Sequence, residues 1–196
     1  MHDVAISTWG NENRTHSTAN LWVKDGALVM KVNGGTPPGH QTTGAEIATT
    51  KGDFLYGSYR ALARTASEPG TVNSPLFYYV NDKSEIDVEI LSSENPRRLV
   101  NFTIHENNRG ADTYRLYTAG FDPSAGFHEY RFDWSPGGVT YFIDGAPTGV
   151  TLKGNTPYQP GHIMVNHWTL SDPGWGGGPP VNDAFMYIKH FEFYYD

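Results

Sequence analysis

The feature that most constrains this chain is the period of two that its apolar residues follow along most of its length. Alternating apolar and polar residues place one face of a β-strand in a core and the other face toward solvent. No stretch of ten residues keeps the period of 3.6 that a helix requires without a glycine, a proline or another helix breaker interrupting it. We therefore predict an all-β chain.

Turn residues divide the alternating segments into short strands. Two hairpins are the clearest, one over residues 20–34 with its turn at residues 24–26, the other over residues 127–143 with its turn at residues 135–138. A turn at Asp144 and Gly145 leads into residues 150–152. The other expected strands are residues 45–50, 56–65, 75–80, 84–91, 99–105, 113–118, 161–170 and 185–195. Because no linker-like segment interrupts them, we expect residues 1–196 to form a single domain, a two-sheet β-sandwich with Greek-key or jelly-roll connections.

Composition excludes several classes of function. The net charge is -7 without a local excess of basic residues, which argues against a nucleic-acid partner. There is no cysteine for a disulfide or a cysteine-ligated metal, and the eight histidines lack the close spacing of a catalytic metal site. No apolar run approaches the roughly 18 residues of a membrane-spanning helix. We expect no membrane partner, no cofactor and a monomer.

The most informative segment is residues 84–91, where Glu85, Asp87 and Glu89 alternate with apolar residues. On a strand the three carboxylates stand in one file on one face, with neighbours roughly 6.6 Å apart at ~3.3 Å per residue. An exposed strand face is the simplest interpretation, but Asp and Glu are depleted in strands. Such a file stores repulsion between like charges unless the protein uses it.

Paired carboxyl groups are the machinery of glycoside hydrolysis. The retaining route needs two of them about 5–5.5 Å apart, one as nucleophile and one as acid/base. Two long Glu side chains that lean together across a twisted strand could close most of the gap between Glu85 and Glu89. Asp87 lies between them and can share a proton with the nucleophile, so the file favours retention over inversion.

Residues 85–89 resemble the Glu-x-Asp-x-Glu signature of glycoside hydrolase family 16. Residues 44–47, 56–59, 126–134 and 161–168 are similar, in the same order, to segments of that family's bacterial lichenases, so the resemblance spans about residues 20–195. It implies a concanavalin A-like β-jelly roll whose concave sheet forms a cleft for a β-glucan polysaccharide or oligosaccharide. It also implies that Glu85 is the nucleophile, Glu89 the acid/base and Asp87 the residue that assists Glu85.

Strand register predicts which residues flank the file. A turn near Asn95 followed by an antiparallel strand would place Asn101 opposite Glu89, Thr103 opposite Asp87 and His105 opposite Glu85. On the other side, a turn near Asp82 would place Phe77 opposite Asp87 and Tyr79 opposite Glu85. Aromatic rings stack on the apolar faces of sugar rings, so Phe77 and Tyr79 are candidate substrate-binding residues. His105 is a candidate for hydrogen bonding to the nucleophile or to the sugar.

The resemblance adds further candidate substrate-binding residues, Glu46, Asn166 and Trp168. Lys83 stands where lichenases carry a tryptophan, so one wall of a sugar subsite is expected to be missing. Residues 172–180 form a loop too aromatic for a passive linker, and its Trp175 could supply that wall. Some members of the family bind a structural calcium, and the resemblance places Lys189 where a carboxylate assists that ion, so the sequence leaves a structural calcium open but does not support it.

We predict a secreted endo-β-glucanase that cuts β-1,3-1,4 or β-1,3 glucans with retention, its signal peptide absent from this chain. Two alternatives stay open. A transglycosylase would use the same residues but pass the glycosyl intermediate to a sugar hydroxyl instead of water. A carbohydrate-binding jelly roll without catalysis would have no need of an acid/base pair. Features of the lichenase and laminarinase branches conflict, so the linkage that is cut stays open.

Overall fold

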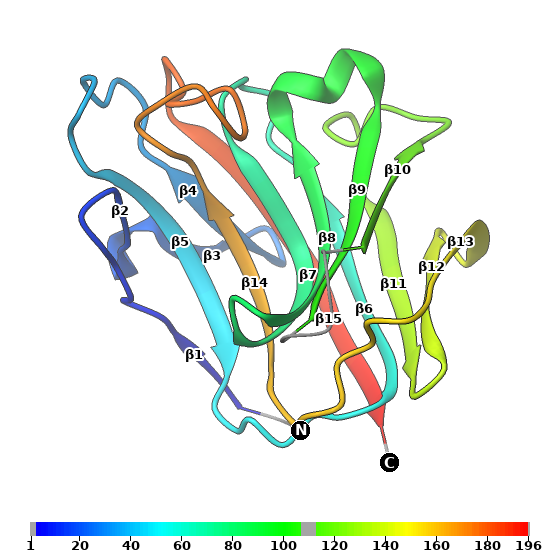
Figure 1. Cartoon of the computed structure of the whole chain (residues 1–196). Helices are drawn as coiled ribbons and strands as arrows, with labels where there is room; N and C mark the ends of the chain where they lie inside the picture. The colour runs from blue at the N-terminus through cyan, green and yellow to red at the C-terminus, as the bar shows by residue number, and fades with distance from the viewer. Residues whose placement is uncertain (1–2, 107–112, 196) are drawn as a thin grey trace.

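The computed structural model, which describes residues 3–106 and 113–195, consists of two β-sheets packed face to face (Figure 1). The eight-stranded sheet has the order β1-β5-β14-β7-β8-β9-β10, with β2 paired to β5, and the seven-stranded sheet has the order β13-β12-β11-β6-β15-β4-β3. Strand pairs in both sheets are antiparallel, except that β2 runs parallel to β5. The predicted all-β, two-sheet jelly-roll sandwich is confirmed.

The elements have the following bounds. The eight-stranded sheet contains β1 (Val4–Ile6), β2 (Arg14–His16), β5 (Thr42–Thr49), β7 (Val72–Asn81), β8 (Ser84–Leu91), β9 (Leu99–Glu106), β10 (Thr113–Thr118) and β14 (His162–Trp168). The seven-stranded sheet contains β3 (Leu21–Lys24), β4 (Ala27–Val32), β6 (Gly57–Arg64), β11 (His128–Ser135), β12 (Gly138–Ile143), β13 (Ala146–Leu152) and β15 (Ala184–Tyr195). Two 3-10 turns, η1 (Thr18–Asn20) and η2 (Ser92–Arg97), complete the described elements.

The hairpins follow from the turn residues. Asp25 and Gly26 have φ of 51° and 72°, and Asp144 and Gly145 have φ of 51° and 76°. Positive φ at both central residues is the backbone of the two-residue turn whose twist matches that of the flanking strands, and Asp-Gly favours it. The second turn starts β13 at Ala146, earlier than the predicted residues 150–152, because no loop separates the turn from the strand.

The core lies between the sheets and takes the apolar face of each strand. On β8 the residues between the carboxylates, Ile86, Val88 and Ile90, are fully buried. Phe102 of β9 stacks on Tyr141 of β12 with ring centroids 4.2 Å apart, and the Tyr141 hydroxyl donates a hydrogen bond to the Thr103 carbonyl at 3.3 Å. The opposite sheet therefore packs against the apolar face of β8 and fixes β9, the strand paired with it.

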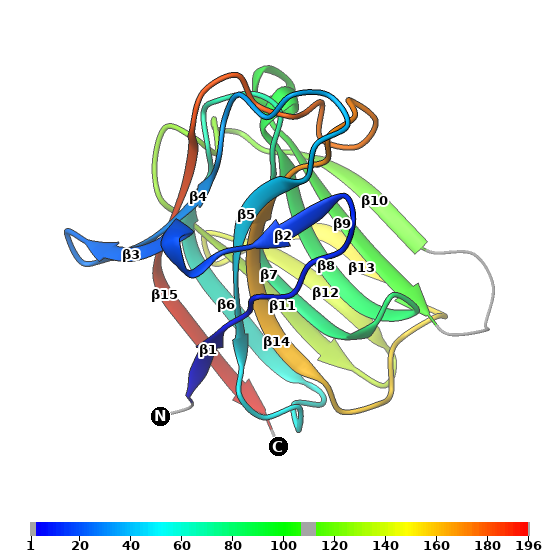
Figure 2. The same cartoon turned by 90° about the vertical axis from the view of Figure 1, so that its left-hand side faces the viewer.

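Strands β1 and β2 were not predicted. Each has three residues, and those of β1 are exposed, so no alternation marks them in the sequence. Both pair with β5 at one side of the eight-stranded sheet, as Figure 2 shows.

Candidate active site

The carboxylate file lies on the face of β8 that points away from the core. Glu85 and Glu89 are half-buried and Asp87 is 4% exposed. All three line a cleft on the eight-stranded sheet, and the part of it that they share with Trp168 and Trp175 has a volume of about 640 Å³. The file occurs where the alternation predicted it, because the buried residues between the carboxylates leave their side chains only the cleft side.

Both predicted registers are confirmed. In β9, His105 pairs with Glu85, Thr103 with Asp87 and Asn101 with Glu89. In β7, Tyr79 pairs with Glu85 and Phe77 with Asp87. The turns at either end of β8 therefore fix which side chains surround each carboxylate.

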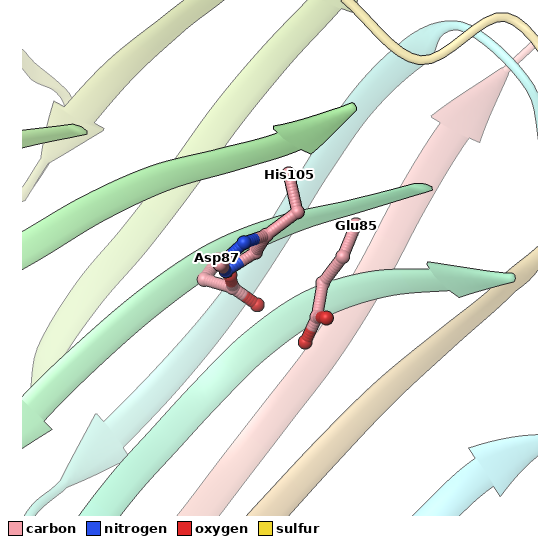
Figure 3. Close-up of side chains that lie close together, drawn as sticks. All are labelled: Glu85, Asp87 and His105. Atoms are coloured by element: carbon pink, nitrogen blue, oxygen red, sulfur yellow. The ribbon is translucent and has the colours of Figure 1, made fainter. Parts of the chain in front are cut away.

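Glu85, Asp87 and His105 form a tight group (Figure 3). His105 Nε2 lies 3.2 Å from Asp87 Oδ2, and one ligand atom from each of the three side chains lies within 4.8 Å of the others. Asp87 is also hydrogen-bonded to Glu85. The histidine thus contacts the aspartate between the two glutamates, whereas the sequence suggested the nucleophile or the sugar as its partner.

Burial and crowding raise the pKa of both glutamates. Burial raises the pKa of Glu85 to about 10, helped by the charge of Asp87 and the hydrogen bond with it. Burial raises the pKa of Glu89 to about 7, opposed by the charge of His105, a hydrogen bond from Ser74 and the charge of Arg14. At neutral pH this face therefore holds at least one proton.

The position of that proton decides which glutamate can attack. If Glu85 kept it, Glu89 would be the anion, which is the reverse of the roles that the resemblance implies. The hydrogen bond between Glu85 and Asp87 offers another arrangement, because a proton on Asp87 leaves Glu85 as the carboxylate that accepts the bond. The proton then belongs to the group and not to one residue.

One half of the cleft lies toward the N-terminal segment, and we call it the N-terminal half. It has a volume of about 400 Å³, and its lining includes Ser7, Trp9, Arg14, Glu46, Phe77, Tyr79, Glu85 and Asn166. Phe77 and Asn166 are buried in its floor, and Tyr79 is half-buried. The Tyr79 hydroxyl donates a hydrogen bond to Asp82 at 2.9 Å, which fixes its ring at the rim.

Glu46 is 6% exposed and has several polar partners. Its carboxylate lies 3.4 Å from Nδ1 of the buried His16 and accepts a hydrogen bond from Asn166 Nδ2 at 3.3 Å. Burial acts to raise the pKa of Glu46, but hydrogen bonds from His16, Ser7 and Asn166 and the charge of His16 lower it below its ordinary value. Glu46 is therefore a fixed acceptor in the floor of the N-terminal half.

The other part of the cleft, which we call the β10 half, lies toward the sheet edge. Its lining includes Asn101, Thr103, His105, Tyr114, Leu116, Trp168 and Trp175. Three large side chains stand exposed there, Tyr114 at 58%, Leu116 at 50% and Trp175 at 42%. Trp175 comes from the loop over residues 172–180, so the prediction that this loop borders the cleft is confirmed.

Every residue predicted for the site lines one of the two halves. Residues that the sequence reasoning missed are Ser7, Trp9, Arg14, His16, Ser74, Tyr114 and Leu116. The register could have found Tyr114 and Leu116, because they pair with Thr103 and Asn101 of β9. Nothing in the sequence pattern places the N-terminal residues in the cleft.

Two places in the structure bear on metal ligation. Among the residues that the structure describes, Glu85, Asp87 and His105 are the group able to hold an ion, but their contacts with one another already account for their positions. At the place considered for a structural calcium, the Lys189 ammonium lies 4.3 Å over the Phe127 ring and offers a cation no oxygen ligand.

Solved structures that superpose on this chain include glucan-cleaving enzymes. A prokaryotic beta-1,3-1,4-glucanase (lichenase) from a mouse hindgut metagenome superposes with a TM-score of 0.83 over 97% of this chain and 92% of that one, at 27% identity. The laminarinase catalytic domain from Thermotoga maritima shares the fold, with a TM-score of 0.77, 94% and 84% coverage and 21% identity.

Curated relatives are beta-glucanases. The chain is 33% identical over 156 residues to a beta-glucanase from Acetivibrio thermocellus, and the match covers 72% of this chain and 44% of the relative. It is 35% identical over 146 residues to a beta-glucanase from Paenibacillus macerans, and that match covers 70% of this chain and 60% of the relative. The matched region is thus about half the length of these relatives. The family model of glycosyl hydrolases family 16 matches residues 2–184, and the chain belongs to that family.

Proposed function

We propose that this protein is a retaining endo-β-glucanase that hydrolyses internal linkages of β-1,3-1,4 or β-1,3 glucans through a glycosyl-enzyme intermediate. The observation that carries the proposal is the file of Glu85, Asp87 and Glu89 on one strand, at the meeting of two cleft halves. The beta-glucanases among its relatives support the substrate class. A cleft that extends to both sides of the file suits attack within a chain.

In the first step the Glu85 carboxylate attacks the anomeric carbon, while the bond from that carbon to the leaving glycosidic oxygen breaks. Glu89 donates its proton to the leaving oxygen, which departs as a sugar hydroxyl. In the second step Glu89 takes a proton from water, the water oxygen bonds to the anomeric carbon, and Glu85 is released. Two inversions at the same carbon give net retention.

Asp87 and His105 keep Glu85 in the ionised form that the first step needs. A proton on Asp87, donated toward Glu85, keeps the nucleophile ionised and oriented without a second free carboxylate beside it. The contact between His105 Nε2 and Asp87 Oδ2 holds Asp87 in place from the neighbouring strand. The pair therefore positions Glu85 and does not itself touch the reacting carbon.

The substrate is proposed to be neutral. Glu46, Asp82 and the three carboxylates of the file all line the cleft, and the protein carries a net charge of -7. An acidic polysaccharide would be repelled. Aromatic side chains in both halves suit the apolar faces of glucose rings.

The remaining parts of the proposal concern the setting of the reaction. We propose one catalytic domain over residues 1–196 that acts as a secreted monomer without a cofactor, and a polymer too large to enter cells supports an extracellular place of action. No helix in the described ranges is long and apolar enough to cross a membrane. Activity that survives exhaustive dialysis against a chelator is expected, and its loss with recovery on added metal would contradict this part.

The test measures reducing-sugar release from barley β-glucan, lichenan and laminarin. Glu89→Gln should lower kcat by about 10²–10⁴-fold, the usual contribution of general acid–base catalysis, and Glu85→Gln should abolish turnover. Glu192→Gln changes an exposed glutamate on β15 and serves as the matched control. Undiminished cleavage in either cleft variant would remove that residue from its role.

Azide separates the two roles by stereochemistry. With an activated aryl glycoside, azide should give Glu85→Ala an α-glycosyl azide by a single displacement, and Glu89→Ala a β-glycosyl azide by capture of the intermediate. The reverse pattern would exchange the roles of the glutamates. Product chains longer than the donor would instead indicate transglycosylation, and binding of glucan without any product would indicate a carbohydrate-binding module.

A further inference from the structure

Arg14 is a cation in the N-terminal half that the mechanism above does not use. It starts β2, is half-buried, and lines the cleft beside Glu46 and Glu85. Its guanidinium carbon lies 3.9 Å from the centroid of the Trp168 ring and 5.4 Å from that of the Trp9 ring. Two indole rings thus hold the guanidinium at the wall of the cleft.

The guanidinium carries N–H donors that the protein leaves unused. Within residues 3–106 and 113–195 it has no hydrogen-bond acceptor and no carboxylate within ion-pair distance, although the charges of Glu46, Glu89, Glu85 and Asp82 all act on it. A guanidinium presents five donors in a rigid fork, and those of Arg14 are not among the buried unpaired atoms of the described residues, so they are accessible from the cleft that Arg14 lines. Stacking explains where Arg14 sits, but it does not satisfy these donors.

The surroundings define the chemistry of what could satisfy them. A carboxylate or sulfate on the ligand would pair with Arg14 but would meet Glu46, Glu85 and Asp82 across the same space. A neutral sugar hydroxyl accepts a hydrogen bond without that repulsion. Charge-assisted bonds from a guanidinium to a neutral oxygen are also stronger than bonds between neutral groups.

We propose that Arg14 is a substrate-binding residue that donates hydrogen bonds to the hydroxyls of a neutral sugar in the N-terminal half of the cleft. This inference rests on the proposed glucanase function. Through its stacking on Trp168, which lines the β10 half, Arg14 also fixes the ring that stands where the two halves meet. The N-terminal segment is then part of the substrate site and not only a cover of the sheet edge.

The experiment compares wild type with Arg14→Ala and Arg14→Lys on a series of glucan oligosaccharides of increasing length. Arg14→Ala should raise KM about tenfold or more for oligosaccharides long enough to fill the N-terminal half, because the variant loses a charge-assisted hydrogen bond to the substrate. The kcat of the variant should stay within about twofold of the wild-type value. Arg14→Lys should recover only part of the loss, because an ammonium keeps the charge but not the planar fork. Arg115→Ala removes an exposed arginine outside the cleft lining and should match wild type.

A second readout distinguishes binding from a structural role. Removing the positive charge should raise the pKa of Glu89 and move the alkaline limb of the pH profile to higher pH in Arg14→Ala but not in Arg14→Lys. Unchanged KM and product pattern in Arg14→Ala would overturn the inference. So would an equal loss on all oligosaccharide lengths together with a lower unfolding temperature, repeated in Arg14→Gln.

The inference and the proposed function can fail separately. If the wild type cleaves no glucan, calorimetric titration of wild type and Arg14→Ala with the same oligosaccharides still measures the contribution of Arg14 to binding. Weaker binding by the variant then supports the inference while the hydrolase function fails. Equal binding by both proteins overturns the inference.

Discussion

The two halves of the cleft are built in opposite ways. The N-terminal half has a floor of buried polar groups, in which Glu46 is held by His16 and Asn166. The β10 half presents exposed apolar surface from Tyr114, Leu116 and Trp175. Both halves carry aromatic rings, but the buried hydrogen-bonding network lies in the N-terminal half and the exposed apolar surface of Tyr114, Leu116 and Trp175 lies in the β10 half.

This difference predicts different contributions to specificity. A site built to hydrogen-bond a hydroxyl strongly rejects a ligand that lacks it, because its buried polar groups are then left unpaired, whereas an apolar surface discriminates by only about 10–200-fold. We therefore expect the N-terminal half to select the sugar and its linkage, and the β10 half to add affinity with little selection.

The largest effect should come from Asp87, which is hydrogen-bonded to Glu85, the carboxylate that lines both halves. Asp87→Asn removes the titratable proton shared with Glu85 and alters the contact with His105 Nε2, so kcat should fall by about 10²-fold or more on every substrate length while KM changes little. Steady-state kinetics on short and long oligosaccharides measure this. A loss confined to long substrates would mean that Asp87 acts in one half only.

The next effect concerns the buried network of the N-terminal half. Glu46→Ala leaves Asn166 Nδ2 without its acceptor and removes the carboxylate beside the buried His16, which should lower the free energy of unfolding by about 1–3 kcal/mol and raise KM for substrates that reach this half. Urea denaturation and kinetics are the measurements. Glu94→Ala, which removes a partly exposed carboxylate paired with Arg97 in the other half, should cost under about 1 kcal/mol. Equal costs would contradict the contrast between the halves.

A smaller effect is expected in the β10 half. Trp175→Ala removes an indole that is 42% exposed, so the stability should hardly change. An aromatic contact worth about 0.5–1.5 kcal/mol corresponds to a roughly 2- to 12-fold rise in KM. The linkage preference, measured as the ratio of activities on lichenan and laminarin, should stay the same. A changed preference would show that this half also selects.

The sequence predicted the central part of the site because strand alternation and antiparallel register carry that information. Once Glu85, Asp87 and Glu89 are placed on one strand, the turns on either side determine that Tyr79 and His105 flank Glu85. The same register, extended one strand further, would have found Tyr114. Two-sheet architecture followed from the same period of two.

The N-terminal half could not be predicted in this way. Trp9 and Arg14 reach the cleft through a segment with three-residue strands, of which β2 pairs in parallel with a strand far along the chain. No periodicity or turn residue encodes such a long-range pairing. The partner of His105 was also missed, because register fixes which residues are opposite each other but not which atoms meet.

The smallest effect should come from Ser74, whose hydroxyl donates a hydrogen bond to Glu89 Oε1 at 3.4 Å. That bond stabilises the ionised form of Glu89, whose pKa is about 7. Glu89 must be protonated to act as the acid, so activity is present below this pKa and is lost as pH rises through it. Ser74→Ala removes the bond, the pKa of Glu89 rises, and the alkaline limb of kcat/KM moves to higher pH. Since the bond is long, and one pKa unit corresponds to about 1.36 kcal/mol, the shift should be less than about one pH unit. A shift to lower pH would mean that the limb reports another group, and the assignment of Glu89 as the acid would then fail.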